Sequence, residues 1–231
     1  MELKTAIVTG ASSGIGYAIS KMLSEEGYSV YGIGRVFKGE TSFFKERISM
    51  DIRDTDILLE KLSSIKDVDV LVNAAGTAYY GLTEFMTPAQ ISEMCRVDLE
   101  APMMITSALL PRIKDKKGYI INIASVTSTR INTHGACYGA LKAGIRSFGR
   151  SLFEEARKHG VKVVTVCPDL TRGTGLYRNA DFEPAEADGC FLVPEDTAEC
   201  VRNILRMRDG ACVTEVEVRP QFNRVEKKQK G

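Results

Sequence analysis

A tyrosine and a lysine lie four residues apart in the stretch "CYGALKAG" near the middle of the chain. At helical spacing Tyr138 and Lys142 share one face, so that the phenol and the amine are neighbours. A free phenol has a pKa near about 10, and a nearby ammonium group favours its ionised form. The pair therefore predicts a phenol that donates or accepts a proton at neutral pH. The alternative is an exposed pair on a helix surface with no chemical role.

A second candidate feature is the glycine-rich stretch "TGASSGIG", which contains Gly10, Gly14 and Gly16. It follows a short apolar run, "TAIVT", and precedes a stretch with apolar residues at helical spacing. Glycines in such a turn let the backbone approach a ligand closely, and the free N–H groups at the helix start suit a pyrophosphate. This context predicts a dinucleotide site. The alternative is a glycine-rich turn that binds nothing.

The elements that must position these residues alternate between strand and helix. The helical patterns cover residues 14–27, 54–65, about 88–112 with a kink or join at Pro102, 135–160 and 194–208, and Asp54 is expected to cap the second of them. Such alternation predicts a doubly wound α/β fold, with a mainly parallel seven-stranded sheet and helices on both faces. The predicted strands are residues 5–9, 29–34, 47–52, 68–76, 118–125, 161–168 and 212–218.

The composition narrows the classes of protein that fit. The 231 residues carry a formal net charge of +1, so no overall field attracts nucleic acid or an anionic membrane. Six scattered cysteines, without a paired spacing, predict reduced thiols and neither a disulfide framework nor a metal site. Without a signal-peptide pattern or a membrane-length apolar run, we expect one cytoplasmic domain, residues 1–231, with a flexible tail from about residue 222.

The spacing of the glycine motif resembles that of the short-chain dehydrogenase/reductase family. "NAAG" at residues 73–76, "MDIRD" with Asp51, and Ser125 followed by Tyr138 and Lys142 match further motifs of this family. The resemblance implies a Rossmann-type fold and a nicotinamide cofactor. The residues it implies at the cofactor are Gly10, Ser12, Ser13, Gly14, Ile15, Gly16, Arg35, Asp51, Ile52, Asn73, Ala74, Ala75, Gly76, Tyr138, Lys142, Pro168, Asp169, Leu170 and Thr171.

The resemblance also implies a role for each catalytic residue. Tyr138 is expected to act as the acid in carbonyl reduction and as the base in alcohol oxidation. Lys142 lowers the pKa of Tyr138 and holds the nicotinamide ribose, and Ser125 donates a hydrogen bond to the substrate oxygen. The family usually has Asn in a proton relay where this chain has Asp98, and Gly where it has Asp169. We expect the charge of Asp98 to oppose ionisation of Tyr138, and activity to survive both changes.

The end of the second predicted strand distinguishes between the two nicotinamide cofactors. NAD-binding proteins of this fold place a carboxylate there, whereas this chain has Gly34 and Arg35. An arginine binds a 2′-phosphate through two hydrogen bonds, and Lys38 is positioned to assist. The sequence therefore predicts NADP(H), although Ser13 replaces a basic residue that some NADP-binding relatives have. The alternative is a solvated arginine at a strand end.

Substrate is expected outside the carboxyl ends of the strands, where loops converge. Residues 171–194 form the expected lid, whose Arg172 and Arg178 either clamp an anionic group or are solvated. His134 is a tempting base, but an ordinary loop histidine is the competing interpretation. The predicted substrate residues are Tyr79, Tyr80, Ser125, Thr127, His134 and Tyr138, with Val126 and Thr133 nearby.

Together these features predict an NADP(H)-dependent oxidoreductase that interconverts a carbonyl and a secondary alcohol. A 3-oxo or 3-hydroxy acid, or its thioester, is the first substrate expected. One alternative is a catalytically weak NADP(H)-binding regulatory or accessory protein. Another is a redox-neutral isomerase or dehydratase on the same fold. The resemblance further implies a homotetramer or homodimer.

Overall fold

Seven parallel strands form one sheet in the computed structural model, which describes residues 3–228. Their order is β3-β2-β1-β4-β5-β6-β8, so the direction of winding reverses between β1 and β4. The doubly wound Rossmann-type fold predicted from the sequence is confirmed. The strands are β1 (Thr5–Thr9), β2 (Ser29–Gly34), β3 (Phe44–Ser49), β4 (Val70–Asn73), β5 (Tyr119–Ile123), β6 (Lys162–Pro168) and β8 (Glu215–Val218).

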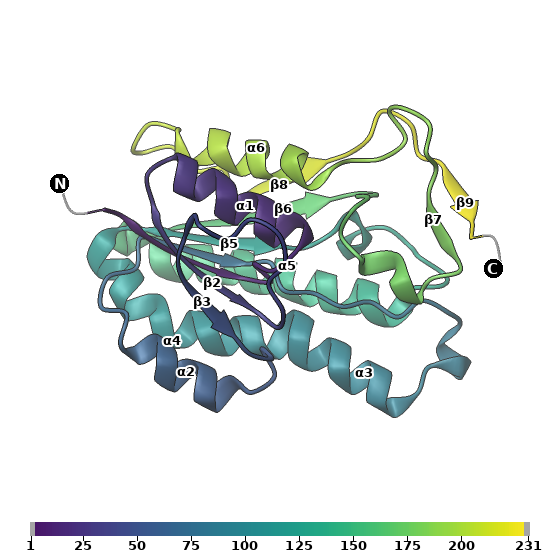
Figure 1. Cartoon of the computed structure of the whole chain (residues 1–231), viewed down its shortest axis with the longest axis horizontal. Coiled ribbons are helices and arrows are strands. Elements are labelled where there is room, and N and C mark those ends of the chain that lie inside the picture. Colours follow the sequence, from purple (N-terminus) through teal and green to yellow (C-terminus); the bar gives the residue numbers. More distant parts are fainter. Residues whose placement is uncertain (1–2, 229–231) are drawn as a thin grey trace.

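Helices cover both faces of this sheet (Figure 1). On one face lie α1 (Gly14–Glu25) and α6 (Pro194–Leu205), and on the other lie α2 (Thr55–Ser63), α4 (Ala101–Lys116) and α5 (Ala136–Ala156). Successive side chains of β1 show the consequence. Ala6 and Val8 pack in the core beneath α1 and α6, whereas Ile7 packs in the core on the opposite face. Strands buried on both faces contain continuous apolar runs, as β1 does at Ala6, Ile7 and Val8.

The long helical stretch predicted around Pro102 is three consecutive segments. Helix α3 (Pro88–Cys95) runs into a π-helical turn, Arg96–Glu100, which is followed directly by α4. Pro102 lies in the first turn of α4, a position that tolerates proline although it has no backbone N–H to donate. The predicted join at Pro102 is therefore confirmed. The π turn contains Asp98, and such turns occur often at functional sites.

The segment after β6 and the C-terminal segment come together outside the main sheet. Strand β7 (Phe182–Pro184) pairs antiparallel with β9 (Val225–Lys227), and a short 3-10 helix, Leu176–Asn179, precedes β7. Part of the tail for which flexibility was expected, from about residue 222, thus forms β9, whose backbone pairs with the lid. Residues 229–231 of that tail lie outside the described residues.

Two local predictions also need correction. Strand β3 ends at Ser49, three residues before the predicted end, and Met50 and Asp51 already belong to the turn that follows. Asp54 precedes α2 as expected, but its side chain makes no capping hydrogen bond. Across residues 3–228, no helix is long and apolar enough to cross a membrane.

Candidate active site

A cleft of about 870 Å³ lies at the carboxyl ends of the parallel strands. Residues that directly follow six strands line it, among them Gly10 after β1, Arg35 after β2 and Ser125 after β5. This is the edge at which doubly wound sheets bind ligands. The fold therefore brings together side chains that are far apart in the sequence.

The glycine turn and the "NAAG" segment are held together by hydrogen bonds. Thr9 Oγ1 accepts from the backbone N–H groups of Ala74 and Ala75, both at 3.1 Å. Gly10 has a φ of +66°, and a Cβ there would lie 2.7 Å from the nitrogen of Ala75. Any larger residue at position 10 would push the two segments apart, so this glycine is required by both its conformation and its neighbours.

Asn73 is the one member of "NAAG" that does not line the cleft. Its Nδ2 donates to Asn122 Oδ1 at 2.9 Å and to Thr106 Oγ1 at 3.1 Å, and all three side chains are buried. The residue therefore connects β4 to β5 and α4 within the sheet. Its predicted contact with a cofactor is not seen in the lining of the cleft, whereas Ala74, Ala75 and Gly76 do line it.

Ser125, Tyr138 and Lys142 meet at the floor of the cleft. Tyr138 lies in the first turn of α5 and is 3% exposed, and Ser125, which follows β5, is close enough for its side chain to lower the pKa of the phenol. Lys142 Nζ lies 5.6 Å from the centre of the Tyr138 ring and donates to the carbonyl oxygen of Ile123 at 3.1 Å. The helical spacing predicted this shared face, and the carbonyl at the end of β5 holds the amine beneath the phenol.

Asp98 is fully buried behind this group, in the π turn. Its Oδ1 lies 3.1 Å from Lys142 Nζ, and its Oδ2 accepts from the backbone N–H of Thr77 at 3.1 Å. Burial raises the pKa of the Asp98 carboxyl, and the Lys142 ammonium acts in the opposite direction. The two charged groups thus form a buried ion pair whose cation faces the phenol.

The pKa of Tyr138 is raised well above its ordinary value. Burial of the phenol is the main cause, the nearby Tyr80 and the Asp98 charge add to it, and the hydrogen bond with Ser125 opposes it. The Asp98 effect has the direction expected from sequence, but the expected lowering of the Tyr138 pKa by Lys142 is not found: the pKa is raised, and Lys142 is not among its causes. The protein alone therefore holds the phenol protonated, which is the form that donates a proton.

Asp169, the second unusual carboxylate, has two arginine partners. Arg130 lies 3.4 Å and Arg219 3.5 Å from its Oδ2, while its Oδ1 accepts from the backbone N–H of Leu170 at 2.9 Å. Its side chain is 8% exposed. The negative charge at this end of β6 is thus compensated within the wall of the cleft.

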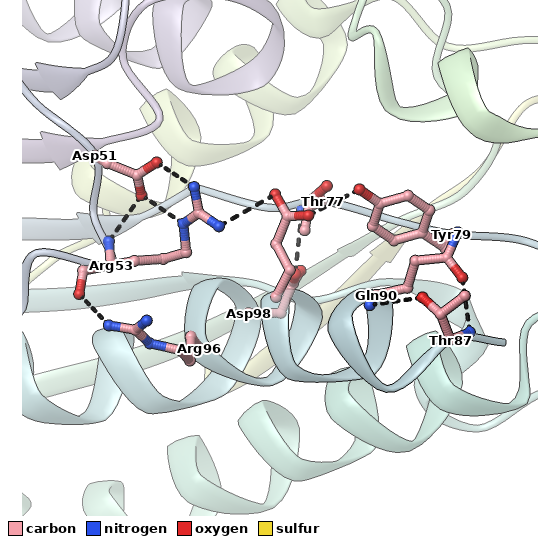
Figure 2. A network of polar contacts seen from close by, with 9 residues as sticks. Asp51, Arg53, Thr77, Tyr79, Thr87, Gln90, Arg96 and Asp98 are labelled. Atoms are coloured by element: carbon pink, nitrogen blue, oxygen red, sulfur yellow. Dashed lines mark hydrogen bonds and ion pairs between the residues drawn. The ribbon is translucent and has the colours of Figure 1, made fainter.

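Asp51, after β3, also lines the cleft, and its carboxylate binds Arg53, a pairing that was not predicted from the sequence. Figure 2 shows Arg53 beside it, with Nε and Nη2 donating to the two carboxylate oxygens at 3.0 and 2.7 Å. These bonds lower the pKa of Asp51 to about 2. Arg53 also lies 3.8 Å from Glu93, whose other oxygen accepts from the Tyr79 hydroxyl at 2.7 Å. Tyr79, predicted to contact substrate, instead binds Glu93 and is absent from the lining of the cleft.

The other predicted substrate residues fall into two groups. Tyr80, Thr127 and His134 line the cleft, and His134 is exposed, with a ring nitrogen 3.2 Å from the Thr133 hydroxyl. Arg172 binds Glu186 and the Pro184 carbonyl oxygen, so that it stabilises the lid rather than facing the cleft. Arg178 lines a smaller neighbouring cavity of about 220 Å³.

The lid also contributes aromatic residues that the sequence analysis missed. Tyr177 and Phe182 line the cleft, and their rings lie 6.1 and 5.1 Å from that of Tyr80, which in turn lies 5.9 Å from the Tyr138 ring. Burial raises the pKa of Tyr177 to about 12, so its hydroxyl is un-ionised. The presence of two aromatic side chains in a mostly polar segment could have indicated from sequence that Tyr177 and Phe182 line the cleft.

Comparison with known proteins identifies the class of protein. The family model for short chain dehydrogenases matches residues 4–183. An uncharacterized oxidoreductase of Staphylococcus epidermidis is 31% identical over 228 residues, covering 94% of this chain and 97% of that protein. An acetoacetyl-CoA reductase of Paracoccus denitrificans is 31% identical over 217 residues, covering 86% and 88%.

Solved structures agree with this assignment. An alcohol dehydrogenase from the archaeon Thermococcus sibiricus, in complex with 5-hydroxy-NADP, superposes with a TM-score of 0.83 at 25% identity, over 96% of this chain and 99% of that one. A metagenomic short-chain oxidoreductase in complex with NADP has a TM-score of 0.78 at 29% identity, over 95% and 98%. The chain belongs to the short-chain dehydrogenase/reductase family and is an oxidoreductase of that family.

Proposed function

We propose that the protein is an NADP(H)-dependent enzyme that interconverts a carbonyl compound and a secondary alcohol. The observation that carries this proposal is the meeting of the buried Tyr138 phenol, Ser125 and Lys142 in the lining of the cleft, with Lys142 Nζ 5.6 Å from the centre of the Tyr138 ring. A buried acid beside a hydroxyl donor is the arrangement that carbonyl reduction requires.

The residues of the glycine turn fit a dinucleotide. Gly10 and Gly14 have positive φ angles, and the side chain of Ser13 makes no capping bond at the start of α1. The first N–H groups of this helix therefore have no side-chain acceptor and are suited to a pyrophosphate. Ser12, Ser13, Ile15 and Gly16 complete this part of the lining.

In the proposed reaction each side chain has one task. Ser125 donates a hydrogen bond to the substrate oxygen, and Tyr138 delivers the proton as charge develops there. The ammonium of Lys142 stabilises the phenolate that remains, and the buried Asp98 keeps that ammonium in place. The bound nicotinamide supplies the hydride. In alcohol oxidation the same groups act in reverse, with Tyr138 as the base.

Arg35 supports NADP(H) over NAD(H). It follows β2 and lines the cleft, and Asp51, a carboxylate whose pKa the charge of Arg35 helps to lower, already binds Arg53. NADP derivatives are bound in the two solved relatives described above. Replacing Arg35 with Asp is expected to invert the preference, since a carboxylate repels the 2′-phosphate and accepts from a ribose hydroxyl. Equal selectivity of the two proteins, measured as the ratio of kcat/KM for NADPH and NADH, would refute this assignment.

For the substrate we propose a 3-oxo acid or its thioester. Similarity to the Paracoccus denitrificans acetoacetyl-CoA reductase supports this class.

The test of the proposed function compares wild type with Tyr138→Phe, using NADPH and a panel of carbonyl compounds. We expect the variant to bind NADPH normally but to lose at least about a hundredfold in kcat, the lower end of what general acid catalysis contributes. If the wild-type protein binds NADPH but does not oxidise it in the presence of any compound of the panel, a regulatory role is favoured. If wild type converts substrate without net redox change, an isomerase or dehydratase is favoured.

A further inference from the structure

Strand β9 forms one wall of the cleft. Asn223, Val225, Glu226 and Lys227 all belong to its lining, although the glycine and tyrosine motifs lie far from them in the sequence. Figure 1 shows β9 beside β7, at the end of the molecule beyond the carboxyl ends of the sheet. The C-terminal segment is therefore placed to contact whatever reacts at Tyr138.

Several hydrogen bonds hold this strand to the lid. The backbone N–H of Ala185 donates to Arg224 O at 3.1 Å, and that of Lys228 donates to Asp181 O at 2.9 Å. The Lys228 ammonium also donates to the carbonyl oxygen of Tyr177. Because these bonds lie on both sides of β7, losing β9 would release the part of the lid that carries the aromatic residues.

The register shows which side chains of β9 share a face with Phe182 of the lid. Opposite residues of an antiparallel pair share a face, so Lys227 lies on the side of Phe182, and Val225 on that same side across from Pro184. The Phe182 ring lies 5.1 Å from the Tyr80 ring, and the Tyr80 ring lies 5.9 Å from the Tyr138 ring. Val225 is 53% exposed beside this aromatic group, an apolar surface that a ligand would cover.

We propose that β9 is a specificity-determining wall of the substrate pocket, and that it selects carbonyl compounds carrying an apolar substituent. The inference rests on the proposed function, which it deepens. Val225, Phe182 and Tyr80 give the substituent an apolar surface. The charged residues at the rim, Asp181, Glu226 and Lys227, are of mixed sign and favour no single ionised group.

The kinetic test uses Val225→Asp, which places a charge on the cleft side of β9 at an exposed position. The matched control is Glu183→Gln, because Glu183 lies on the other face of the β7–β9 pair and does not line the cleft. Substrates are methyl ketones, from propanone to those with longer alkyl chains and a phenyl group. For wild type and the control, kcat/KM is expected to rise along the series. In Val225→Asp the larger members should lose about tenfold or more, with propanone unchanged.

Identical profiles for Val225→Asp and wild type would overturn the proposal. A second measurement does not depend on turnover: hydrogen exchange of residues 176–185 in full-length protein and in a chain that ends at Gln221. Faster exchange there, with the main sheet unchanged, supports β9 as the support of the lid, and equal exchange overturns it. Should wild type reduce no ketone while exchange still responds to the truncation, the proposed function fails and the role of β9 in the lid stands.

Discussion

Replacement of Asp98 with Asn tests the electrostatics of the site most directly. Asn keeps the size of the side chain, and its oxygen can still accept from Thr77 or Lys142, but the negative charge is lost. The ammonium retains its bond to the Ile123 carbonyl oxygen. Because the Asp98 charge is one cause of the raised pKa of Tyr138, its removal makes the phenol more acidic.

The size of this effect follows from two distances. Asp98 Oδ1 lies 3.1 Å from Lys142 Nζ, which lies 5.6 Å from the centre of the Tyr138 ring, so the carboxylate is within about 9 Å of that ring. A unit charge about 8 Å away, at an effective dielectric constant of about 20, is worth about 2 kcal/mol. Since about 1.4 kcal/mol corresponds to one pH unit, we expect a change of about 1.5 units.

The assay is the pH dependence of kcat/KM for alcohol oxidation with NADP⁺, in which Tyr138 must lose its proton. The limb that rises with pH should move to lower pH by about 1.5 units in Asp98→Asn. Asp169→Asn is the matched control, because the charge of Asp169 is compensated by Arg130 and Arg219, and its limb should stay in place. A limb that stays fixed or moves to higher pH in Asp98→Asn, in protein that unfolds at a near-normal temperature, would refute the reasoning.

Two predictions concern stability. Glu215 binds Arg146 and Arg150, which lower its pKa from 4.5 to about 2, so it stabilises the fold above its unfolded pKa and loses this effect as pH falls towards 2. Glu215→Gln should therefore cost about 1 kcal/mol at neutral pH, after allowing for solvent screening, and the difference from wild type in chemical denaturation should vanish near pH 2. In Gly149→Ala the new Cβ would lie 2.5 Å from Thr165 Oγ1 in the core, and this overpacking should cost about 1–3 kcal/mol. An unchanged denaturation midpoint would show that α5 shifts without cost.

The fold was predictable from sequence because each strand and helix carries its own local pattern. Continuous apolar runs such as β1 indicate strands covered on both faces, and Pro102 marked the join between helical segments correctly. The errors lie where backbone partners decide the structure. Nothing in the polar sequence of β9 indicates a strand, and it becomes one because β7 presents unpaired backbone groups beside it.

The same distinction holds for the site. Tyr138 and Lys142 are one helical turn apart, so their neighbourhood follows from helix geometry alone. By contrast, Tyr79 and Tyr80 are adjacent, and no local rule says which faces the cleft. Glu93, from α3, decides it by accepting the Tyr79 hydroxyl, a contact between segments that only the folded chain brings together. Pairing of Asp51 with Arg53 was missed for another reason, because the two charges are close in sequence but their geometry depends on the turn after β3.

These two kinds of residue divide the work of the cleft. The motif residues lie in the floor of the cleft, and in the proposed function their chemical groups carry out the reaction. Two of the walls are formed by residues to which the sequence analysis gave no individual role: Arg53 at one end and the β7–β9 pair at the other. A wall held by a few hydrogen bonds can be altered by substitution without disturbing the sheet. Substitution of Asn73 or Gly10 would disturb it, because Asn73 connects two central strands and Gly10 lies against the backbone of the neighbouring turn. Selectivity in this protein is therefore expected to respond to changes in β9 that leave the proton transfer at Tyr138 intact.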